Sequence, residues 1–409
     1  MKKLLINSFS CHLIGLCVVT LYLLSLTSER SFIPNTIVNS ICLVNLAYLL
    51  TAIALPQISK YVFLERKYYI LPLLAVAYSI IIASIVMLRI DYSRTFLIQG
   101  FLVSFVWLYT TTYIRKNAKK LCLYAIPNFD LEPLKKHKNI NLFVVDENSQ
   151  LSEIKHGLVV DLHHNITAEQ EKFIADCSIN NIRVFHSESI REIVEGKVQT
   201  QHLSENSIGT LQPNPIYFHV KRIWESILII ASLPITLPIM FITAILIKIE
   251  NPGPAMFYQE RVGQGGKVFK IYKFRSMTVR HKDAKSKFAT EEQARVTRIG
   301  KVIRKVRIDE LPQFLNVLKG EMALIGPRPE QQSFVKQFEQ EIPFYGYRHM
   351  VKPGITGWAQ TVQGYTDDVD STREKLAHDL YYIKHLSIWL DINIVFKTIK
   401  TMMTGFGAK

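Results

Sequence analysis

Two adjacent carboxylates, Asp309 and Glu310, stand among basic residues in the C-terminal half of the chain. Three cations precede the pair and a fourth follows it: Arg304, Lys305, Arg307 and Arg328. A carboxylate pair among arginines is typical of phosphoryl transfer, because in that chemistry a protein mainly positions the reacting groups and neutralises charge. The simpler interpretation is that Asp309 is a helix N-cap and Glu310 a favourable acid in the first helical turn.

An ionised Asp309 can act in phosphoryl transfer in either of two ways. It can attack phosphorus and form an acyl phosphate, which divides the transfer into two steps. It can instead hold a metal ion while the acceptor attacks phosphorus directly, in one step. Carboxylates and phosphates suit Mg²⁺ better than Zn²⁺, so we expect Mg²⁺ at Asp309 and Glu310.

The pattern from residue 304 to residue 320 predicts the helix that positions these acids, with Asp309 at its start. Four apolar residues share one helix face at the i, i+3, i+4, i+7 spacing: Leu311, Phe314, Leu315 and Leu318. Pro312 is tolerated in a first turn, and Gly320 is suited to a C-terminal cap. Both ends of the helix are therefore marked in the sequence.

The N-terminal part of the chain is dominated by apolar residues. Four stretches are each close to the roughly 20 residues that cross a bilayer: residues 9–28, 36–56, 69–88 and 95–114. We expect a four-helix transmembrane bundle over residues 1–117. Lysine and arginine are concentrated in alternate loops, so the positive-inside rule places both ends of the bundle in the cytoplasm.

Residues 118–198 have the composition of a soluble domain, with short apolar runs separated by polar and helical segments. This pattern predicts a small cytoplasmic α/β domain with a parallel, Rossmann-like sheet. It has no glycine-rich phosphate loop, so we assign it no cofactor, and we interpret His163 and His164 as solvated loop residues. The polar stretch 199–215 predicts a linker to the last domain, residues 216–409.

A fifth apolar segment opens the last domain, and no charged residue lies between Glu225 and Lys248. Its length alone predicts a spanning helix. Pro234 and Pro238 lie within it, and each removes a helical hydrogen bond and favours a kink. A crossing would also place the basic sequence that follows outside the cytoplasm, against the positive-inside rule. We therefore expect a proline-broken re-entrant helix that enters the cytoplasmic leaflet and returns.

The composition of the whole chain indicates a membrane protein with an anionic partner. Of the 409 residues, 48% are hydrophobic, and the formal net charge is +15. The positive charge fits nucleic acid, an acidic membrane surface or a phosphorylated substrate. The five cysteines include neither a CxxC pair nor a cluster with histidine, which argues against disulfides and a zinc site.

A series of short motifs runs from residue 216 to the end of the chain. After Lys221-Arg222 and the proline-broken segment come, in order, Gly253-Pro254, Tyr258-Gln-Glu-Arg-Val-Gly263, Ile271-Tyr-Lys-Phe-Arg-Ser-Met277, Asp309-Glu310-Leu311, Asn316-Val-Leu-Lys-Gly320, Gly326-Pro-Arg-Pro329 and Lys352-Pro-Gly-Ile-Thr-Gly-Trp358. This series resembles the bacterial sugar transferases, which are polyprenyl-phosphate hexose-1-phosphate transferases. The added bundle and soluble domain resemble the large members that prime exopolysaccharide, capsule or O-antigen synthesis.

The resemblance implies an enzyme of the bacterial inner membrane with a mostly α catalytic domain on the cytoplasmic face. Asp309 would be the nucleophile that displaces UMP from a UDP-sugar, and Glu310 would help to hold Mg²⁺. Undecaprenyl phosphate would then accept the phosphosugar, which gives an undecaprenyl-diphosphate sugar. Lys273 would pair with the nucleophile, and the candidate substrate-binding residues are Arg275, Arg304, Arg328, Asp379 and Asp391. The last two are also compatible with structural ion pairs to arginines.

The chain departs from the family pattern in three places. The acid after Lys221-Arg222 is Glu225 instead of aspartate, and the helix break is Leu237-Pro238 instead of Ser-Pro. Gln360 is not followed by Asn-Gly-Arg-Asn, so an arginine that would contact the sugar nucleotide is missing. The donor is therefore left open, with UDP-glucose as the first expectation and UDP-galactose as the second.

Further partners follow from the same patterns. Residues 386–403 predict either an interfacial amphipathic helix or a helix of the core. We expect membrane lipids as partners, and a homodimer is left open. A non-catalytic, membrane-tethered basic scaffold is the alternative to an enzyme. Nucleic acid is not expected, because the last domain lacks a helix-turn-helix and its cations cluster around acids.

Overall fold

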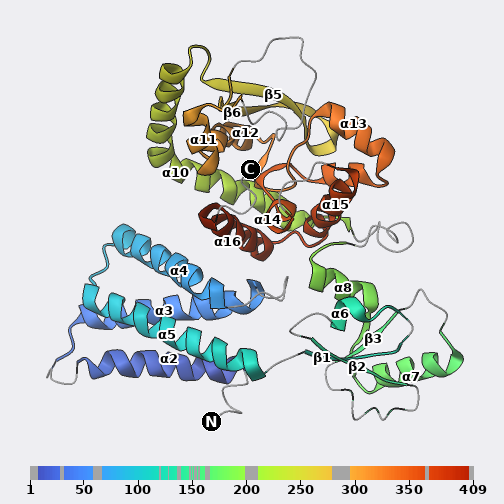
Figure 1. Cartoon of the computed structure of the whole chain (residues 1–409). Coiled ribbons are helices and arrows are strands. Elements are labelled where there is room, and N and C mark those ends of the chain that lie inside the picture. Colours follow the sequence, from blue (N-terminus) through green and yellow to red (C-terminus); the bar gives the residue numbers. More distant parts are fainter. Residues whose placement is uncertain are drawn as a thin grey trace. The chain divides into compact units, whose positions relative to one another are not determined.

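Figure 1 shows the computed structural model of the protein, which describes residues 8–27, 32–58, 67–118, 121–127, 129–135, 140–146, 149, 151, 154, 157–161, 166–198, 211–278, 295–363 and 368–404. The chain divides into two compact units, Met1–Gly196 and Lys197–Lys409. The finer boundaries expected near residues 117, 198 and 215 remain predictions, and residues 199–210 of the expected linker lie outside the described part.

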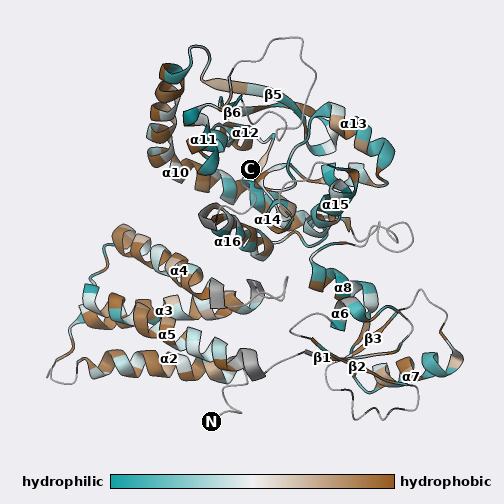
Figure 2. Cartoon of the chain, viewed as in Figure 1, coloured by the Kyte–Doolittle hydropathy of each residue, from teal (hydrophilic) through white to brown (hydrophobic). Residues whose placement is uncertain are grey.

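The N-terminal unit begins with four apolar helices: α2 (Ser8–Ser25), α3 (Asn35–Ile58), α4 (Lys67–Leu88) and α5 (Arg94–Ala118). The last three contain apolar stretches of 22, 20 and 21 residues, long enough to cross a membrane, and the stretch in α2 is shorter. Val19 and Val44 are buried between helices, whereas Leu21 and Ile53 are exposed. Outward apolar side chains suit lipid, and the expected set of four apolar helices is confirmed (Figure 2).

The rest of the N-terminal unit is an α/β fold with a parallel sheet of strand order β2-β1-β3-β4. Its elements are β1 (Leu121–Ala125), α6 (Glu132–Lys135), β2 (Ile140–Val144), β3 (Leu158–Val160), α7 (Ala168–Ile179), β4 (Val184–His186) and α8 (Ser187–Glu195). Leu158 packs with Phe173 of α7, and Val159, on the other face, packs with Ile190 of α8. The predicted parallel sheet is confirmed; the pair at 163–164 lies outside the described residues.

The fifth apolar segment forms α10 (Pro215–Glu250), which opens the C-terminal unit. Figure 1 shows α10 as two arms that meet at a bend, and Pro234 and Pro238 lie in the middle of the element. The antiparallel strands β5 (Met256–Val262) and β6 (Val268–Phe274) follow it. Few side chains in the apolar stretch of α10 are buried. Figure 2 shows much of this helix in brown, the colour of hydrophobic residues.

Both arms of α10 pack near the same strand. Ile229 of the first arm belongs to one cluster with Ile271 of β6, and Ile247 of the second arm belongs to another with Phe274 of β6. A straight helix would separate the two α10 residues by about 27 Å, whereas three strand residues span about 10 Å. α10 therefore folds back, so that both of its ends contact one domain.

The remaining elements of the C-terminal unit are mostly short helices, as expected. They are the 3-10 helix η4 (Gln264–Gly266), α11 (Arg298–Lys305), the 3-10 helix η6 (Ile308–Gln313), α12 (Phe314–Lys319), β7 (Ala323–Ile325), α13 (Gln332–Glu341), the 3-10 helix η7 (Tyr345–Met350), β8 (Gly354–Thr356), α14 (Trp358–Val362), α15 (Val369–Lys384) and α16 (Ile388–Thr404). β7 and β8 form a short parallel pair. In α16, Leu390 and Ile394 are buried while Ile388, Val395 and Ile399 are exposed, so the helix presents apolar side chains both to the core and outward.

The single helix predicted over residues 304–320 is wrong. The structure divides this segment into the end of α11, the 3-10 helix η6 and α12, with Gly320 as the expected cap. Leu315, placed on the predicted apolar face, is 47% exposed, and Val317 is buried instead. Pro312 provides no amide hydrogen, and a 3-10 turn holds 3.0 residues instead of 3.6, so the buried face shifts.

Candidate active site

Asp309 and Glu310 lie in the first turn of η6, a helix that begins directly after a strained backbone position. Arg307 has a φ of 59°, in the left-handed region that residues other than glycine rarely adopt. Its carbonyl accepts a hydrogen bond from the Glu310 amide at 3.2 Å. β6 packs beside η6 and supplies Lys273. Backbone strain of this kind is found at active sites, where the surroundings hold it in place.

Three cations surround the buried carboxylate of Glu310. Its Oε1 lies 2.9 Å from Nζ of Lys273, 3.3 Å from Nη1 of Arg328 and 3.9 Å from Nη1 of Arg307. Burial acts to raise the pKa of Glu310, but the three cations outweigh it and hold that pKa well below its ordinary value. Glu310 is therefore a permanently ionised group that fixes the surrounding cations.

Asp309 has the opposite electrostatic character. Burial and the negative charge of Glu310 raise the pKa of Asp309 from 3.8 to about 6, although nearby cations oppose the rise. Its Oδ1 is buried and has no hydrogen-bond partner among the described residues. Two neighbouring carboxylates whose pKa values are driven apart are typical of a catalytic pair with separate roles.

Lys273 and Arg328 lie beside the acid pair, as predicted from the sequence, but their ion-pair partner is Glu310. Both were expected near the nucleophile or a phosphate, and the structure gives each an ion pair with Glu310. Burial lowers the pKa of Lys273, and the charge of Glu310 opposes that change. The pair Lys273–Glu310 joins β6 to η6 and so holds Asp309 in position.

Arg328 is positioned by the contact between β7 and β8. A Cβ on Gly354 would lie 2.1 Å from the amide nitrogen of Gly326, so this approach requires glycine. The Gly354 amide donates to the Pro327 carbonyl at 2.9 Å, which fixes the turn before Arg328. The motifs Gly326-Pro-Arg-Pro329 and Lys352-Pro-Gly-Ile-Thr-Gly-Trp358 are thus two halves of one packing contact.

Asp379 acts on Arg328 indirectly. Its Oδ2 lies 2.9 Å from Nη2 of the buried Arg348, which confirms an ion pair with an arginine. The same Arg348 nitrogen donates to the Arg328 carbonyl at 2.8 Å. The structure does not bring Asp379 to Glu310, and its expected role in substrate binding stays a prediction.

Asp391 lies in a separate buried network and pairs with Lys221, not with an arginine as expected. It also accepts hydrogen bonds from Tyr217 at 2.6 Å and from Tyr382 at 2.9 Å. Lys221 also lies 2.9 Å from Glu225, whose Oε1 accepts from the Ile325 amide of β7 at 3.2 Å. This network attaches the first arm of α10 to β7 and α16.

Arg304 and Arg275 are not brought to the acid pair by any contact among the described residues. Arg304 lies in the last turn of α11, where its carbonyl accepts a hydrogen bond from the Arg307 amide at 3.2 Å. Arg275 donates from Nη2 to the Asn251 carbonyl. A Cβ on Gly253, whose φ is +130°, would lie 2.6 Å from Nη1 of Arg275. Their expected phosphate-binding roles stay predictions.

Three residues that shape the site were not predicted as site residues from the sequence. Arg307 was noted only as a nearby charge, and its position three residues before Glu310 was the signal for a contact. Arg348 reaches Asp379, and Lys221 reaches Asp391, across long stretches of chain, so no local pattern predicts these two ion pairs.

The acid pair has the donor atoms that a magnesium ion prefers. The three ion pairs of Glu310 all use Oε1, and Asp309 offers the buried, unpartnered Oδ1. No group of three or more histidine, cysteine or acidic side chains occurs in the part of the chain that the structure describes. Mg²⁺ commonly binds through one or two carboxylates plus substrate phosphates, so the two acids fit this ion.

Comparisons with known proteins agree with this chemistry. The family model for the bacterial sugar transferase matches residues 216–405. The chain is 45% identical over 365 residues to the UDP-N-acetylgalactosamine-undecaprenyl-phosphate N-acetylgalactosaminephosphotransferase of Aeromonas hydrophila, which covers 89% of this chain and 86% of the relative. The similarity therefore extends through the N-terminal unit.

Two other relatives match less than half of the chain. The UDP-glucose:undecaprenyl-phosphate glucose-1-phosphate transferase of Escherichia coli strain K12 is 42% identical over 182 residues, which are 44% of this chain and 39% of the relative. The exopolysaccharide production protein PSS of Rhizobium leguminosarum bv. phaseoli is 38% identical over 191 residues, which are 45% of this chain and 96% of the relative.

Proposed function

Because the chain belongs to the bacterial sugar transferases and is a hexose-1-phosphate transferase, we propose that it works through a covalent phosphosugar on Asp309. The donor is a UDP-sugar and the acceptor is undecaprenyl phosphate. The observation that carries this proposal is the contrast between the two acids. Glu310 is held ionised by three cations, while Asp309 keeps a buried oxygen without a partner and a pKa raised to about 6.

In the first step, an oxygen of the Asp309 carboxylate attacks the phosphorus that carries the sugar. The phosphoanhydride bond breaks, its electron pair leaves with UMP, and the phosphosugar is bonded to Asp309. A carboxylate with a raised pKa is a stronger nucleophile, and one with a pKa of about 6 is still mostly ionised at neutral pH.

In the second step, a phosphate oxygen of undecaprenyl phosphate attacks the same phosphorus. The bond to Asp309 breaks, and its carboxylate leaves with the electron pair. Lys273, Arg307 and Arg328 provide positive charge beside the phosphorus in both steps. Asp309 and Glu310 would hold Mg²⁺, which neutralises charge on phosphate oxygens when it is bound.

For the donor, we place UDP-N-acetylgalactosamine ahead of UDP-glucose. The relative named for the former sugar matches along nearly all of this chain, whereas the relative named for UDP-glucose matches 44% of it. UDP-glucose and UDP-galactose, expected from the sequence alone, remain untested. Release of UMP from a panel of UDP-sugars would rank the donors, and a clear preference for UDP-glucose would overturn our order.

We place the active site at the cytoplasmic face of the inner membrane, with α10 as a re-entrant helix. Support comes from the contacts of Ile229 and Ile247, which attach both arms of α10 to the same domain. A straight, spanning helix would hold its two ends on opposite sides of the bilayer.

The position of α10 can be tested by cysteine labelling. Single cysteines at the exposed positions Gln212 and Lys267, in a variant without the native cysteines, flank the helix on either side. A membrane-impermeant thiol reagent should label neither position in intact cells and both in inverted vesicles. Labelling of the two positions from opposite sides would show that α10 spans the membrane.

A labelled donor distinguishes the covalent mechanism from direct transfer. The protein is incubated with a UDP-sugar that carries ³²P in the β-phosphate, without a lipid acceptor. We expect protein-bound label that Asp309→Asn abolishes and that undecaprenyl phosphate removes. Full turnover without any protein-bound label would support one-step transfer, in which Asp309 only holds the metal. If the protein released no UMP from any donor, the alternative of a non-catalytic, membrane-tethered scaffold would be favoured.

A further inference from the structure

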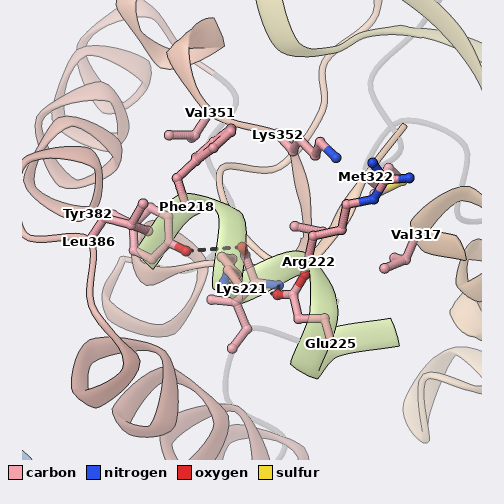
Figure 3. Close-up of a pocket in the computed structure, with 12 residues that line it drawn as sticks. Phe218, Lys221, Arg222, Glu225, Val317, Met322, Val351, Lys352, Tyr382 and Leu386 are labelled. Carbon is pink, nitrogen blue, oxygen red and sulfur yellow. Dashed lines mark hydrogen bonds and ion pairs between the residues drawn. The ribbon is translucent and has the colours of Figure 1, made fainter. Parts of the chain in front are cut away.

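A separate pair of cations, Arg222 and Lys352, lies near Gly320, the residue that caps the C-terminal end of α12. Figure 3 shows the pocket that contains it, between the first arm of α10 and the segment around β7. Apolar side chains line part of this pocket, among them Phe218, Val317, Met322 and Val351. Arg222 and Lys352 direct their nitrogen atoms to one side of the same pocket (Figure 3).

The charged side chains of this pocket differ in whether they form ion pairs. Lys221 and Glu225 also line it, but they bind each other at 2.9 Å, and Lys221 pairs with Asp391 as well. In the described part of the chain, neither Arg222 nor Lys352 forms an ion pair with an acid or a side-chain hydrogen bond. Two cations are therefore held together without an ion pair to a carboxylate among these residues, although the charge of Glu225 acts on Lys352.

Both cations converge on Gly320. A Cβ built on this glycine would lie 3.1 Å from Nη2 of Arg222 and 3.5 Å from Nζ of Lys352. Burial and the charge of Arg222 lower the pKa of Lys352, although Glu225 opposes the change. Holding two like charges this close is unfavourable, and a bound anion would offset the repulsion.

Arg222 also lies within the exposed apolar surface of α10, which includes Ile216 and Val220 before it. Ile223, Ile227 and Leu228, which follow it, are all more than half exposed. With α10 in the cytoplasmic leaflet, as proposed above, such a cation lies at the level of the lipid headgroups. The pocket thus presents positive charge beside a surface that suits an acyl or prenyl chain.

We propose that Arg222 and Lys352 bind the phosphate group of a membrane lipid at a site separate from Asp309 and Glu310. A guanidinium and an ammonium can donate together to the oxygens of one phosphate. The chain of that lipid would lie along the exposed side of the first arm of α10. The inference rests on the proposed membrane position of α10, and it does not depend on the covalent chemistry of Asp309.

Lipid binding is measured on the full-length protein in neutral detergent by native mass spectrometry, without any nucleotide sugar. The probes are undecaprenyl phosphate, phosphatidylglycerol and inorganic phosphate, each added alone. Because charge-assisted hydrogen bonds are lost, we expect Arg222→Gln/Lys352→Gln to weaken lipid binding about tenfold or more. The matched control Lys267→Gln/Lys270→Gln removes two exposed cations of the same unit and should bind as the wild type does.

The three probes identify the source of the phosphate. Weaker binding of undecaprenyl phosphate alone assigns the site to the acceptor, and weaker binding of both lipids assigns it to phospholipids in general. Binding of inorganic phosphate as tight as that of the lipids would overturn a lipid site, as would equal lipid binding by wild type and double variant. If the double variant unfolds, Lys352→Gln alone provides the same comparison. Because no sugar donor is present, failure here is distinguishable from failure of the covalent mechanism.

Discussion

The two acids of the site differ in their contacts with the nearby cations. Lys273, Arg307 and Arg328 all contact Glu310, and Asp309 retains an oxygen without a partner. Burial and the neighbouring carboxylate then raise the pKa of Asp309. Adjacent residues of similar chemistry thereby obtain separate roles, with Glu310 as the anchor and Asp309 as the reactive group.

Replacement of Asp309 separates activity from stability. In Asp309→Asn we expect UMP release to fall by about a thousandfold or more, because the nucleophile is lost. At pH 8 the variant should also melt at a higher temperature than the wild type. The folded-state pKa of Asp309, about 6, is above the ordinary value of 3.8, so stability is lost as the pH rises between these two values, and the loss is complete at pH 8.

UMP release and thermal unfolding at pH 8 check both expectations. Asp370→Asn, at an exposed position, is the matched control and should leave both unchanged. An Asp309→Asn protein that retains UMP release would exclude Asp309 as the nucleophile.

The rate of UMP release should depend on pH through the ionisation of Asp309. The attacking form is the carboxylate, so the rate should be low below the pKa and rise with pH to a plateau, with a midpoint of about 6. Mg²⁺ favours the ionised form and should move the midpoint to lower pH. Single-turnover measurements at saturating donor and several Mg²⁺ concentrations test this, and a midpoint independent of Mg²⁺ would argue against metal binding at Asp309.

At the scale of elements, α10 is attached to the catalytic domain by different means at its two ends. Its first arm carries Lys221 and Glu225, which form a buried polar network with Asp391 of α16 and the Ile325 amide of β7. At the other end, Glu250 accepts hydrogen bonds from the first amides of α11. β7 leads directly to Arg328, so the membrane helix and the active site share one support.

Loss of Asp391 should therefore destabilise the domain and slow catalysis. In Asp391→Asn, Lys221 loses one of the two anionic partners that it has among the described residues, and breaking a buried ion pair costs about 3 to 5 kcal/mol. We expect a lower melting temperature of the purified protein and a smaller rate of UMP release.

The exposed Asp370→Asn is again the control, with an expected effect within about 0.5 kcal/mol. A melting temperature of Asp391→Asn that equals the control would show that the network does not stabilise the fold.

At the scale of the whole molecule, the residues of the proposed active site and the N-terminal unit belong to different parts of the chain. Every residue of the proposed active site belongs to the unit Lys197–Lys409, which also contains α10 as its own membrane element. The Rhizobium leguminosarum relative is aligned over 96% of its own length, and the aligned residues are 45% of this chain. That relative therefore has no room for a comparable N-terminal unit. We therefore expect that the bundle and the parallel sheet are not required for the chemistry.

Residues 197–409 expressed alone should bind membranes through α10 and retain UMP release within about tenfold of the full chain. The measurement compares UMP release in isolated membranes at equal protein amounts, with the same fragment carrying Asp309→Asn as control. A folded, membrane-bound fragment without activity would show that the N-terminal unit takes part in catalysis.

The sequence by itself determined the features that depend on local composition. A stretch that meets lipid must be apolar over its whole length, so the membrane helices were visible directly. The order of short motifs identified the family and singled out Asp309-Glu310. The C-terminal cap of α12 at Gly320 was also predicted correctly, whereas the start of that helix was not. The choice of buried residues in this segment was not predicted correctly. Pro312 lies in a 3-10 turn, and a pattern of 3.6 residues per turn does not describe such a turn.

Only the tertiary structure decided which charges meet. Lys273 reaches Glu310 from β6 and Arg328 reaches it from beyond β7, and such contacts depend on how distant segments pack. The same is true of Asp379 and Asp391, whose partners lie on other elements. It also decided that the two arms of α10 return to one strand, because a proline weakens a helix locally while its neighbours set the direction of the bend.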